Sequence, residues 1–231
     1  MINTKLIAFA KTPGLTPVKT RLAKTKGIVF AESLYHHCLE CMAEVLRETQ
    51  ITNSGVEATW ILAEKEAETD PFWKGSELAL GTPLFQSEGE LGSRLSNAFQ
   101  NAITRHSVVG FLGTDLPQLS RSVLESALKK IRTSADFVIG PSRDGGFYLL
   151  FARKMIPSHI WTSIEYSSEH TCSELVAKLS KLGRVEQTEV LTDIDNEEDL
   201  VFAEAELQDL KASQGLLPAQ ERLLQFLRAK S

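Results

Sequence analysis

Short apolar runs alternate along the chain with stretches in which apolar residues recur at helical spacing. The segments with the apolar pattern of strands are 5–10, 56–62, 83–87, 107–113, 136–140, 147–152 and 184–191. The segments with helical patterns are 31–48, 91–104, 120–132, 168–182, a helix opened by 192–200, and 218–229. This alternation predicts an α/β fold with a mainly parallel central sheet flanked by helices. We expect one domain over 1–231, with 218–231 as a C-terminal helix.

Charge and hydropathy exclude several classes of protein. The formal net charge of the 231 residues is −5, so a generic nucleic-acid surface is not expected. No run of about 18 apolar residues occurs, so no membrane span is expected. The first residues lack the long apolar stretch of a signal peptide, and we therefore expect a cytoplasmic protein.

Two features have both a chemical and a structural interpretation. Cys38 and Cys41 form a Cys-x-x-Cys pair beside two histidines, which is one spacing of a metal site. They also share the apolar face of the predicted helix 31–48, and this core position is the favoured interpretation. Trp161 is able to stack on a sugar or a base, but burial in the core is favoured for it too. The five histidines show no convergent pattern.

A basic loop, "KTPGLTPVKTRLA", follows the first predicted strand. In parallel α/β sheets, ligands bind beyond the carboxyl ends of the strands. Proline and glycine bend the backbone here, and amides near a helix start can face an anion. Lys11, Lys19 and Arg21 supply positive charge, and arginine suits bidentate phosphate contacts. Phosphate binding and a solvated loop remain alternatives at this point.

Carboxylates follow three of the other strands. Asp115 in "FLGTDLP" is placed either to bind Mg²⁺ or Mn²⁺ or to cap the next helix. Asp144 opens a tight Asp-Gly-Gly turn that either meets a ligand or simply closes a hairpin. Asp193 and Asp195, two apart in "TDIDNEEDL", share one face of an extended segment. They either converge on a metal, or Asp195 or the following asparagine caps the helix.

The order of these motifs resembles the nucleotide-diphospho-sugar transferase superfamily, which has a GT-A-like fold. It is most similar to the DUF2064 family, which includes arsenosugar-biosynthesis-type glycosyltransferases. The matching stretches are "KTPGLTPVKTRL", "GELGSRLSNAF", "GTDLPQL", "GPSRDGGFYLL" and "DIDNEEDL", from residue 11 to 200. One departure is Gly14, which directly follows Pro13, whereas the family has its Pro-Gly two residues later.

The resemblance implies a role for each matching residue. Those implied to bind the nucleotide phosphates are Lys11, Thr12, Pro13, Gly14, Lys19, Arg21 and Arg94. Asp115 and Asp195 are implied to hold Mg²⁺ or Mn²⁺, with Asp193 less strongly indicated. Asp144 and Arg21 are the implied catalytic residues. Asp144, Gly145 and Gly146 are expected on the acceptor side, where Asp144 acts as general base on an acceptor hydroxyl.

The resulting expectation is a metal-dependent glycosyltransferase that uses a nucleotide-sugar donor and a small-molecule acceptor. The alternative is a nucleotidyltransferase, like the molybdenum-cofactor or phospholactate guanylyltransferases, that condenses an NTP with a phosphorylated substrate. The glycine-rich loop of many nucleotidyltransferases is absent from the sequence, which favours the first function. A nucleotide-sensing module without catalysis is the third hypothesis.

Overall fold

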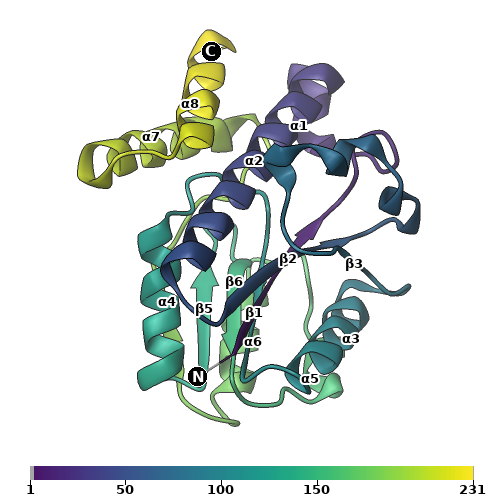
Figure 1. Ribbon diagram of the computed structural model, residues 1–231, viewed down its shortest axis with the longest axis vertical. Helices are drawn as coiled ribbons and strands as arrows, with labels where there is room; N and C mark the ends of the chain where they lie inside the picture. The colour runs from purple at the N-terminus through teal and green to yellow at the C-terminus, as the bar shows by residue number, and fades with distance from the viewer. Residues whose placement is uncertain (1–2, 231) are drawn as a thin grey trace.

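The computed structural model describes residues 3–230, with residue 230 as backbone only (Figure 1). Its strands are β1 (Thr4–Ala10), β2 (Val56–Leu62), β3 (Leu84–Phe85), β4 (Val108–Leu112), β5 (Phe137–Pro141), β6 (Phe147–Ala152) and β7 (Val185–Gln187). Its α-helices are α1 (Thr20–Lys26), α2 (Ile28–Thr52), α3 (Leu91–Ile103), α4 (Arg121–Thr133), α5 (Ser158–Thr162), α6 (Thr171–Leu179), α7 (Glu197–Gln214) and α8 (Pro218–Lys230). Three 3₁₀ turns lie between β2 and β3, at Lys65–Glu68, Pro71–Lys74 and Ser76–Leu78.

The strands form one seven-stranded sheet in the order β3-β2-β1-β4-β6-β5-β7. All neighbouring pairs are parallel except β4–β6 and β5–β6, because β6 runs antiparallel to both of its neighbours. The mainly parallel sheet confirms the predicted fold class. The carboxyl ends of β1, β4 and β5 therefore meet at one edge of the sheet, and the three loops that follow them are brought together there.

Helices cover both faces of the sheet (Figure 1). One face packs against α2 and α4, with Leu39 and Leu124 among its fully buried side chains. The other packs against α3, α5 and α6, with Phe99, Trp161 and Leu175. A third apolar cluster joins α1 and α2 to the C-terminal helices α7 and α8. This cluster fixes the C-terminal helices beside the edge that carries the loops.

The basic loop differs most from its sequence-based prediction. Residues 20–26 form helix α1, which was expected to be loop, and α2 spans 28–52 rather than 31–48. Lys19 begins α1 in the left-handed region at φ 47°, and Gly27 separates the two helices at φ 86°. Helix α5 was also unexpected, and the predicted strand 184–191 is ordered as β7 only over 185–187. Short elements such as these carry little periodicity for a sequence to reveal.

The two ambiguous sequence features belong to the core. Cys38 and Cys41 are buried, unpaired thiols on the inner face of α2. Trp161 is fully buried and contacts Phe99 and Phe111, so it is not exposed for stacking on a sugar. Within residues 3–230, no helix is long and apolar enough to cross a membrane.

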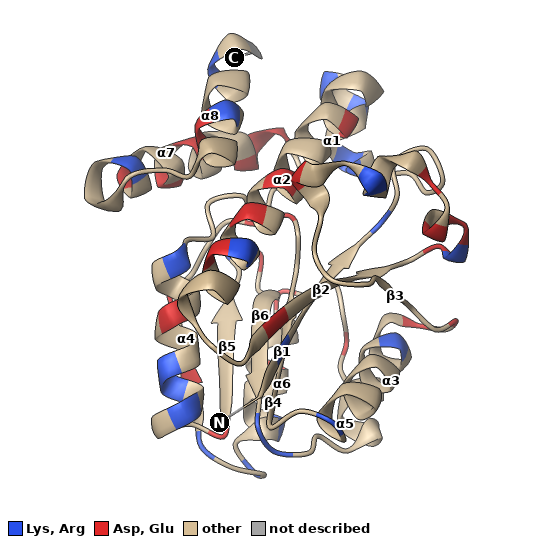
Figure 2. Ribbon diagram, viewed as in Figure 1, with Lys and Arg blue, Asp and Glu red and all other residues tan. Residues whose placement is uncertain are grey.

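Acidic and basic positions are interspersed over the ribbon (Figure 2). The acidic first turn of α7 contains Glu197, which pairs with Lys26 of α1 at 3.5 Å. This ion pair joins the acidic stretch at 193–199 to the helix that follows the basic loop. Segments more than 160 positions apart in the sequence thus become neighbours.

Candidate functional site

A cavity of about 580 Å³ opens at the carboxyl edge of the sheet. The charged side chains that line it are Lys11, Lys19, Arg21, Arg94, Asp115, Asp144, Asp193 and Asp195. They come from the four loops after the strands, from the start of α1 and from α3, and a position at strand ends is what the motifs predicted. One cavity therefore brings together cations and carboxylates that the sequence distributes over 185 positions.

Asp115 lies just beyond β4, in a turn held by its neighbours. The Gly113 amide donates to the Tyr148 carbonyl at 2.9 Å, and the Thr114 hydroxyl donates to the Phe9 carbonyl at 3.1 Å. Helix α4 is capped by Ser120, whose hydroxyl accepts from the Val123 amide at 3.2 Å. Asp115 is therefore not the helix cap, and its carboxylate is left for the cavity.

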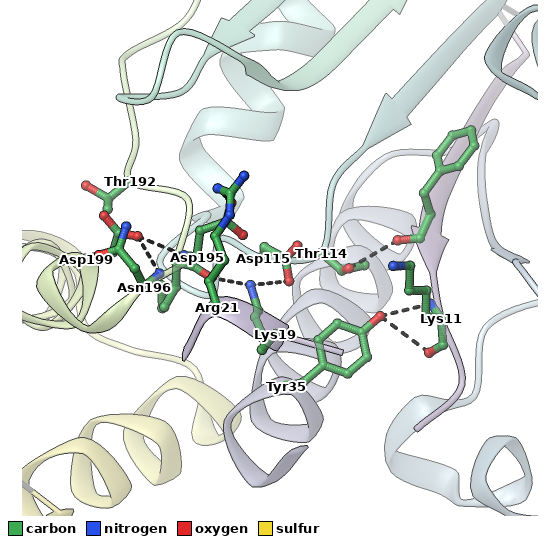
Figure 3. Close-up of polar contacts among 12 residues, drawn as sticks. Lys11, Lys19, Arg21, Tyr35, Thr114, Asp115, Thr192, Asp195, Asn196 and Asp199 are labelled. Atoms are coloured by element: carbon green, nitrogen blue, oxygen red, sulfur yellow. Dashed lines mark hydrogen bonds and ion pairs between the residues drawn. The ribbon is translucent and has the colours of Figure 1, made fainter. Parts of the chain in front are cut away.

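Asp193 and Asp195 precede α7 without capping it. The helix begins with a capping box made by Asn196 and Asp199. Asp199 Oδ2 accepts from the amides of Asp195 and Asn196, each at 2.8 Å (Figure 3). These bonds hold the backbone of the acidic loop and leave the Asp193 and Asp195 side chains directed at the cavity.

The three carboxylates form one acidic cluster. One oxygen each from Asp115, Asp193 and Asp195 lie within 4.8 Å of one another. Burial, followed by the Asp115 charge, raises the pKa of Asp193 far above its ordinary value, and burial also raises the pKa of Asp195. Asp193 Oδ1 is buried without a hydrogen-bond partner among the described residues. Oxygen ligands at this spacing with an unsatisfied buried carboxylate fit a hard divalent cation such as Mg²⁺ or Mn²⁺.

Lys19 is turned into this cluster rather than toward the open cavity. Its side chain is 2% exposed, and its ammonium pairs with Asp115 and donates to the Ile194 carbonyl (Figure 3). Burial by itself lowers the pKa of Lys19, but the Asp115 and Asp193 charges outweigh it, so the pKa is raised. In this structure its ammonium therefore contacts oxygen atoms of the acidic cluster, and its predicted role as a phosphate ligand stays a prediction.

The other cations of the basic loop are more accessible. Arg21 Nη1 pairs with Asp195 Oδ2 at 2.9 Å, and the Arg21 side chain is 67% exposed. The backbone of Lys11 is fixed by the Tyr35 hydroxyl, which accepts from its amide at 2.9 Å. The Lys11 side chain lies on the cavity wall without an ion pair among residues 3–229. Lys11 is thus unpaired in that range, and Arg21, although paired with Asp195, is exposed to an anionic ligand.

The turn 12–14 lies outside the wall of this cavity, and its predicted part in phosphate binding stays a prediction. The Thr12 amide donates to Glu64 Oε2, and its hydroxyl accepts from Trp73 Nε1, each at 2.9 Å. Thr12, Pro13 and Gly14 are not among the residues of the cavity wall. The Thr12 amide is already satisfied by a carboxylate, so in this structure it does not offer a free donor to an anion.

The Asp-Gly-Gly turn presents Asp144 to the cavity. Asp144 Oδ1 accepts from the Ser142 hydroxyl at 2.5 Å and from the Gly146 amide at 3.0 Å. Gly145 has φ 89°, and a Cβ at this position would lie 2.1 Å from the Glu169 carbonyl oxygen. This glycine is therefore required by the close approach of the 165–171 segment and does not line the cavity. Asp144 and Gly146 do line it.

Arg94 lies in the first turn of α3, on the cavity wall. Its Nη1 donates to Gln86 Oε1 at 2.7 Å, and its Nε is buried without a hydrogen-bond partner in the described part of the chain. The cavity also has walls that sequence patterns did not indicate, including Tyr166, Ser167 and Ser168 between α5 and α6. Ser167 has φ 63°, a left-handed conformation that the residue type and its neighbours in the sequence do not predict.

A further residue missed by sequence, Glu206 of α7, supports the acidic loop. Glu206 accepts from the Thr192 hydroxyl at 2.6 Å, from the Thr192 amide at 3.1 Å and from Gln118 Nε2 at 2.8 Å. Gln118 Nε2 also donates to the Thr192 carbonyl at 2.6 Å. Thr192, the residue directly before Asp193, is thus held at its amide, hydroxyl and carbonyl by side chains that are not part of the cavity wall.

Replacing Glu206 by Gln is expected to lower the free energy of unfolding by about 1–3 kcal/mol, because an amide cannot accept all of these hydrogen bonds at both ends. It is also expected to weaken Mn²⁺ binding, since the Asp193 backbone loses its support. Denaturant unfolding and calorimetry with Mn²⁺ measure the two effects. Glu204→Gln is the matched control, because Glu204 lies on the same helix and pairs outward with Arg228 at 3.4 Å. Equal behaviour of the two variants would contradict the supporting role of Glu206.

Several solved structures have a similar fold. The chain superposes on a candidate nucleotide-diphospho-sugar transferase from Desulfovibrio desulfuricans G20 with a TM-score of 0.81 and 24% identity, covering 100% of this chain and 99% of that one. It also resembles the 4-diphosphocytidyl-2C-methyl-D-erythritol synthase of Anaerococcus prevotii, at a TM-score of 0.55 and 14% identity over 90% and 96% of the two chains.

A third similar structure is the glucosyl-3-phosphoglycerate synthase of Mycobacterium tuberculosis, in complex with Mn²⁺, UDP and glucosyl-3-phosphoglycerate. Its TM-score is 0.52 at 11% identity, covering 99% of this chain and 80% of that one. At these identities the likeness extends to the fold. No functionally curated protein matches the sequence.

The family comparison gives a more direct assignment. The model described as "Uncharacterized protein conserved in bacteria (DUF2064)" matches residues 42–168, more than half of the chain. The matched segment contains Arg94, Asp115 and Asp144, while the basic loop and the 193–195 pair lie outside it. This match confirms the resemblance that the motifs indicated, and the chain belongs to the DUF2064 family.

Proposed function

We propose that this protein is a metal-dependent glycosyltransferase that moves a sugar from a nucleotide-diphosphate donor to a small-molecule acceptor. The observation that carries the proposal is the convergence of accessible cations, an acidic cluster and a separate carboxylate, Asp144, in one cavity. The solved structures that share this fold include enzymes that use nucleotides and nucleotide sugars, and this supports a transferase.

The residues divide into two groups by charge. Asp115 and Asp195, with Asp193, are the ligands for Mg²⁺ or Mn²⁺, which when bound offsets the negative charge that develops on the leaving diphosphate. Lys11 and Arg21 bind the diphosphate oxygens, and Arg21 is also the catalytic cation. Fixed cations aimed at the leaving group lower the barrier electrostatically, and losing one such donor typically costs on the order of 10²–10³ in rate.

Asp144 is the proposed general base. Its Oδ1 is held by the Ser142 hydroxyl and the Gly146 amide, so the orientation of the carboxylate is fixed. The other oxygen, Oδ2, takes part in neither bond and is the atom that accepts the proton of the acceptor hydroxyl. Gly146 lies beside it on the acceptor side of the cavity.

A nucleotidyltransferase is the second candidate, because a diphosphocytidyl-methylerythritol synthase shares the fold. In that reaction a phosphate of the substrate attacks the α-phosphorus of an NTP, and pyrophosphate leaves. The two functions differ in the released product. Release of a nucleoside diphosphate from a nucleotide sugar supports the glycosyltransferase, whereas release of pyrophosphate from an NTP supports the alternative.

A thermal-shift panel of UDP-, GDP-, ADP- and CMP-sugars and of NTPs, with and without Mn²⁺, tests the proposal. A ligand at 100 times its dissociation constant stabilises the folded state by about 2.7 kcal/mol, which is easily seen as a higher melting temperature. We expect a stabilising donor whose effect needs Mn²⁺. If none of these nucleotides changes the melting temperature, both transferase functions lose their support.

A further inference from the structure

Lys19 is an unusual cation for a phosphate site. Arg21 and Lys11 reach open parts of the cavity, but the Lys19 ammonium lies inside the acidic cluster that is the proposed metal site. It is the only buried lysine among residues 3–229. Because metal ligands must offer free oxygens, an ammonium on Asp115 withholds one of them.

The backbone directs Lys19 inward. Lys19 has φ 47° and ψ 43°, a left-handed conformation that L-residues seldom adopt. Its carbonyl accepts from the Ala23 amide at 2.8 Å, which closes the first turn of α1 on this residue. The strained residue is thus fixed at the start of a helix, while its side chain retains a flexible four-carbon stem.

The charges around Lys19 require a cation. Asp115, Asp193 and Asp195 lie together, and the cations that pair with this cluster are Lys19 from inside and Arg21 from the rim. The ammonium donates to the carbonyl of Ile194, the residue between Asp193 and Asp195. It therefore links Asp115 to the loop that carries the other two aspartates. Without a metal, these carboxylates would otherwise repel one another at short range.

From this arrangement we infer that Lys19 is a resident cation that competes with the divalent metal for Asp115. Its ammonium holds the acidic cluster together when no metal is bound, and a metal that takes Asp115 Oδ1 as a ligand must displace it from that oxygen. The diphosphate, which needs a cation of its own, then offers Lys19 a second partner across the same cavity. Metal and diphosphate are therefore expected to bind cooperatively. This inference rests on the proposed function for the identity of the ligand, but not for the competition itself.

The competition is tested with Mn²⁺ alone, in the absence of any nucleotide. We expect Lys19→Met to bind Mn²⁺ at least about tenfold more tightly than the wild type, because a positive charge a few ångströms from the ion is removed at low dielectric. Lys11→Met is the matched control, since Lys11 lines the same cavity without pairing with the cluster, and its Mn²⁺ affinity is expected to stay within about twofold. Unchanged or weaker Mn²⁺ binding by Lys19→Met would overturn the inference.

A second measurement uses the wild-type protein and does not depend on the variant being folded. The protons of a buried, ion-paired lysine ammonium exchange slowly with water, so the group gives an observable ¹H–¹⁵N signal. We expect one such signal from Lys19 in the metal-free protein. Addition of Mg²⁺ to saturation is expected to remove its protection. A signal that stays protected while calorimetry reports a saturated site would show that the metal and Lys19 do not compete.

These outcomes separate the inference from the proposed function. If the nucleotide panel succeeds but Lys19→Met leaves Mn²⁺ binding unchanged, the competition fails and the transferase stands. If the panel fails and Lys19→Met still binds Mn²⁺ more tightly, the competition stands without the transferase.

Discussion

Replacing Asp115 by Asn is expected to abolish Mn²⁺-dependent nucleotide binding and also to destabilise the fold. The loss of binding follows because a carboxamide lacks the charge that a hard cation requires. The loss of stability follows because Asp115 is the ion-pair partner of Lys19, which is 2% exposed. Breaking a fully buried pair costs about 3–5 kcal/mol, and we expect a smaller loss because the Asp115 side chain is 34% exposed and Asp193 still faces the ammonium.

Two measurements separate these effects. Denaturant unfolding reports the stability, and calorimetry with Mn²⁺ reports the metal. The double variant Lys19→Met with Asp115→Asn removes both charges, so it is expected to recover most of the stability and none of the Mn²⁺ dependence. Wild-type metal dependence in Asp115→Asn would exclude Asp115 as a ligand. Wild-type stability would show that the pair with Lys19 contributes little.

Replacing Arg21 by Ala is expected to weaken the binding of a nucleoside diphosphate by roughly one to two decades. A hydrogen bond to an ionised partner contributes about 1.5–3 kcal/mol, and each decade of affinity corresponds to about 1.4 kcal/mol. Arg21→Lys is expected to recover only part of the loss, because an ammonium cannot reproduce the planar bidentate contact of a guanidinium. Binding of the nucleoside alone should not change, since it has no phosphate.

Titration calorimetry with the diphosphate and with the nucleoside checks this result. Stability should change by less than about 1 kcal/mol, because the Arg21–Asp195 pair is largely exposed. Arg121→Ala is the matched control, since Arg121 also pairs with a carboxylate, Glu125 at 3.3 Å, but lies on α4 away from the cavity. Diphosphate binding by Arg21→Ala that equals the wild type would mean that the basic loop has no part in phosphate recognition.

The alternation of apolar runs and helical periodicity was sufficient to predict the class of this fold. Strands such as 56–62 and 147–152 occur as predicted, because each buries a mostly apolar segment that is visible locally. The same reasoning identified the loops of the site. Motifs that follow parallel strands must meet at one edge, and this geometric rule needs no knowledge of individual contacts.

The conformation within those loops was decided by the tertiary structure. The sequence groups Lys11, Lys19 and Arg21 in one basic loop, but the fold turns Lys19 onto Asp115, leaves Arg21 on the rim and fixes Lys11 only by its backbone. The reason is that a charge is stabilised by the partners and burial it meets in space, and these partners come from the turn after β4, from α2 and from the loop before α7. Spacing along the chain does not encode them.

The acidic loop shows the same difference between what local sequence determines and what long-range contacts determine. The sequence determined that Asp193 and Asp195 lie side by side before a helix, because their separation and the acidic first turn are local. Asn196, one of the two caps that the sequence offered, begins the helix in a local capping box, whereas only the tertiary structure decided that Glu206 and Gln118 hold Thr192. Hydrogen bonds across 74 positions, such as the one from Gln118 to Thr192, form because packing of the third apolar cluster brings α7 to this edge. Local patterns thus determine where the site lies, and long-range packing determines which of its charges are free to act.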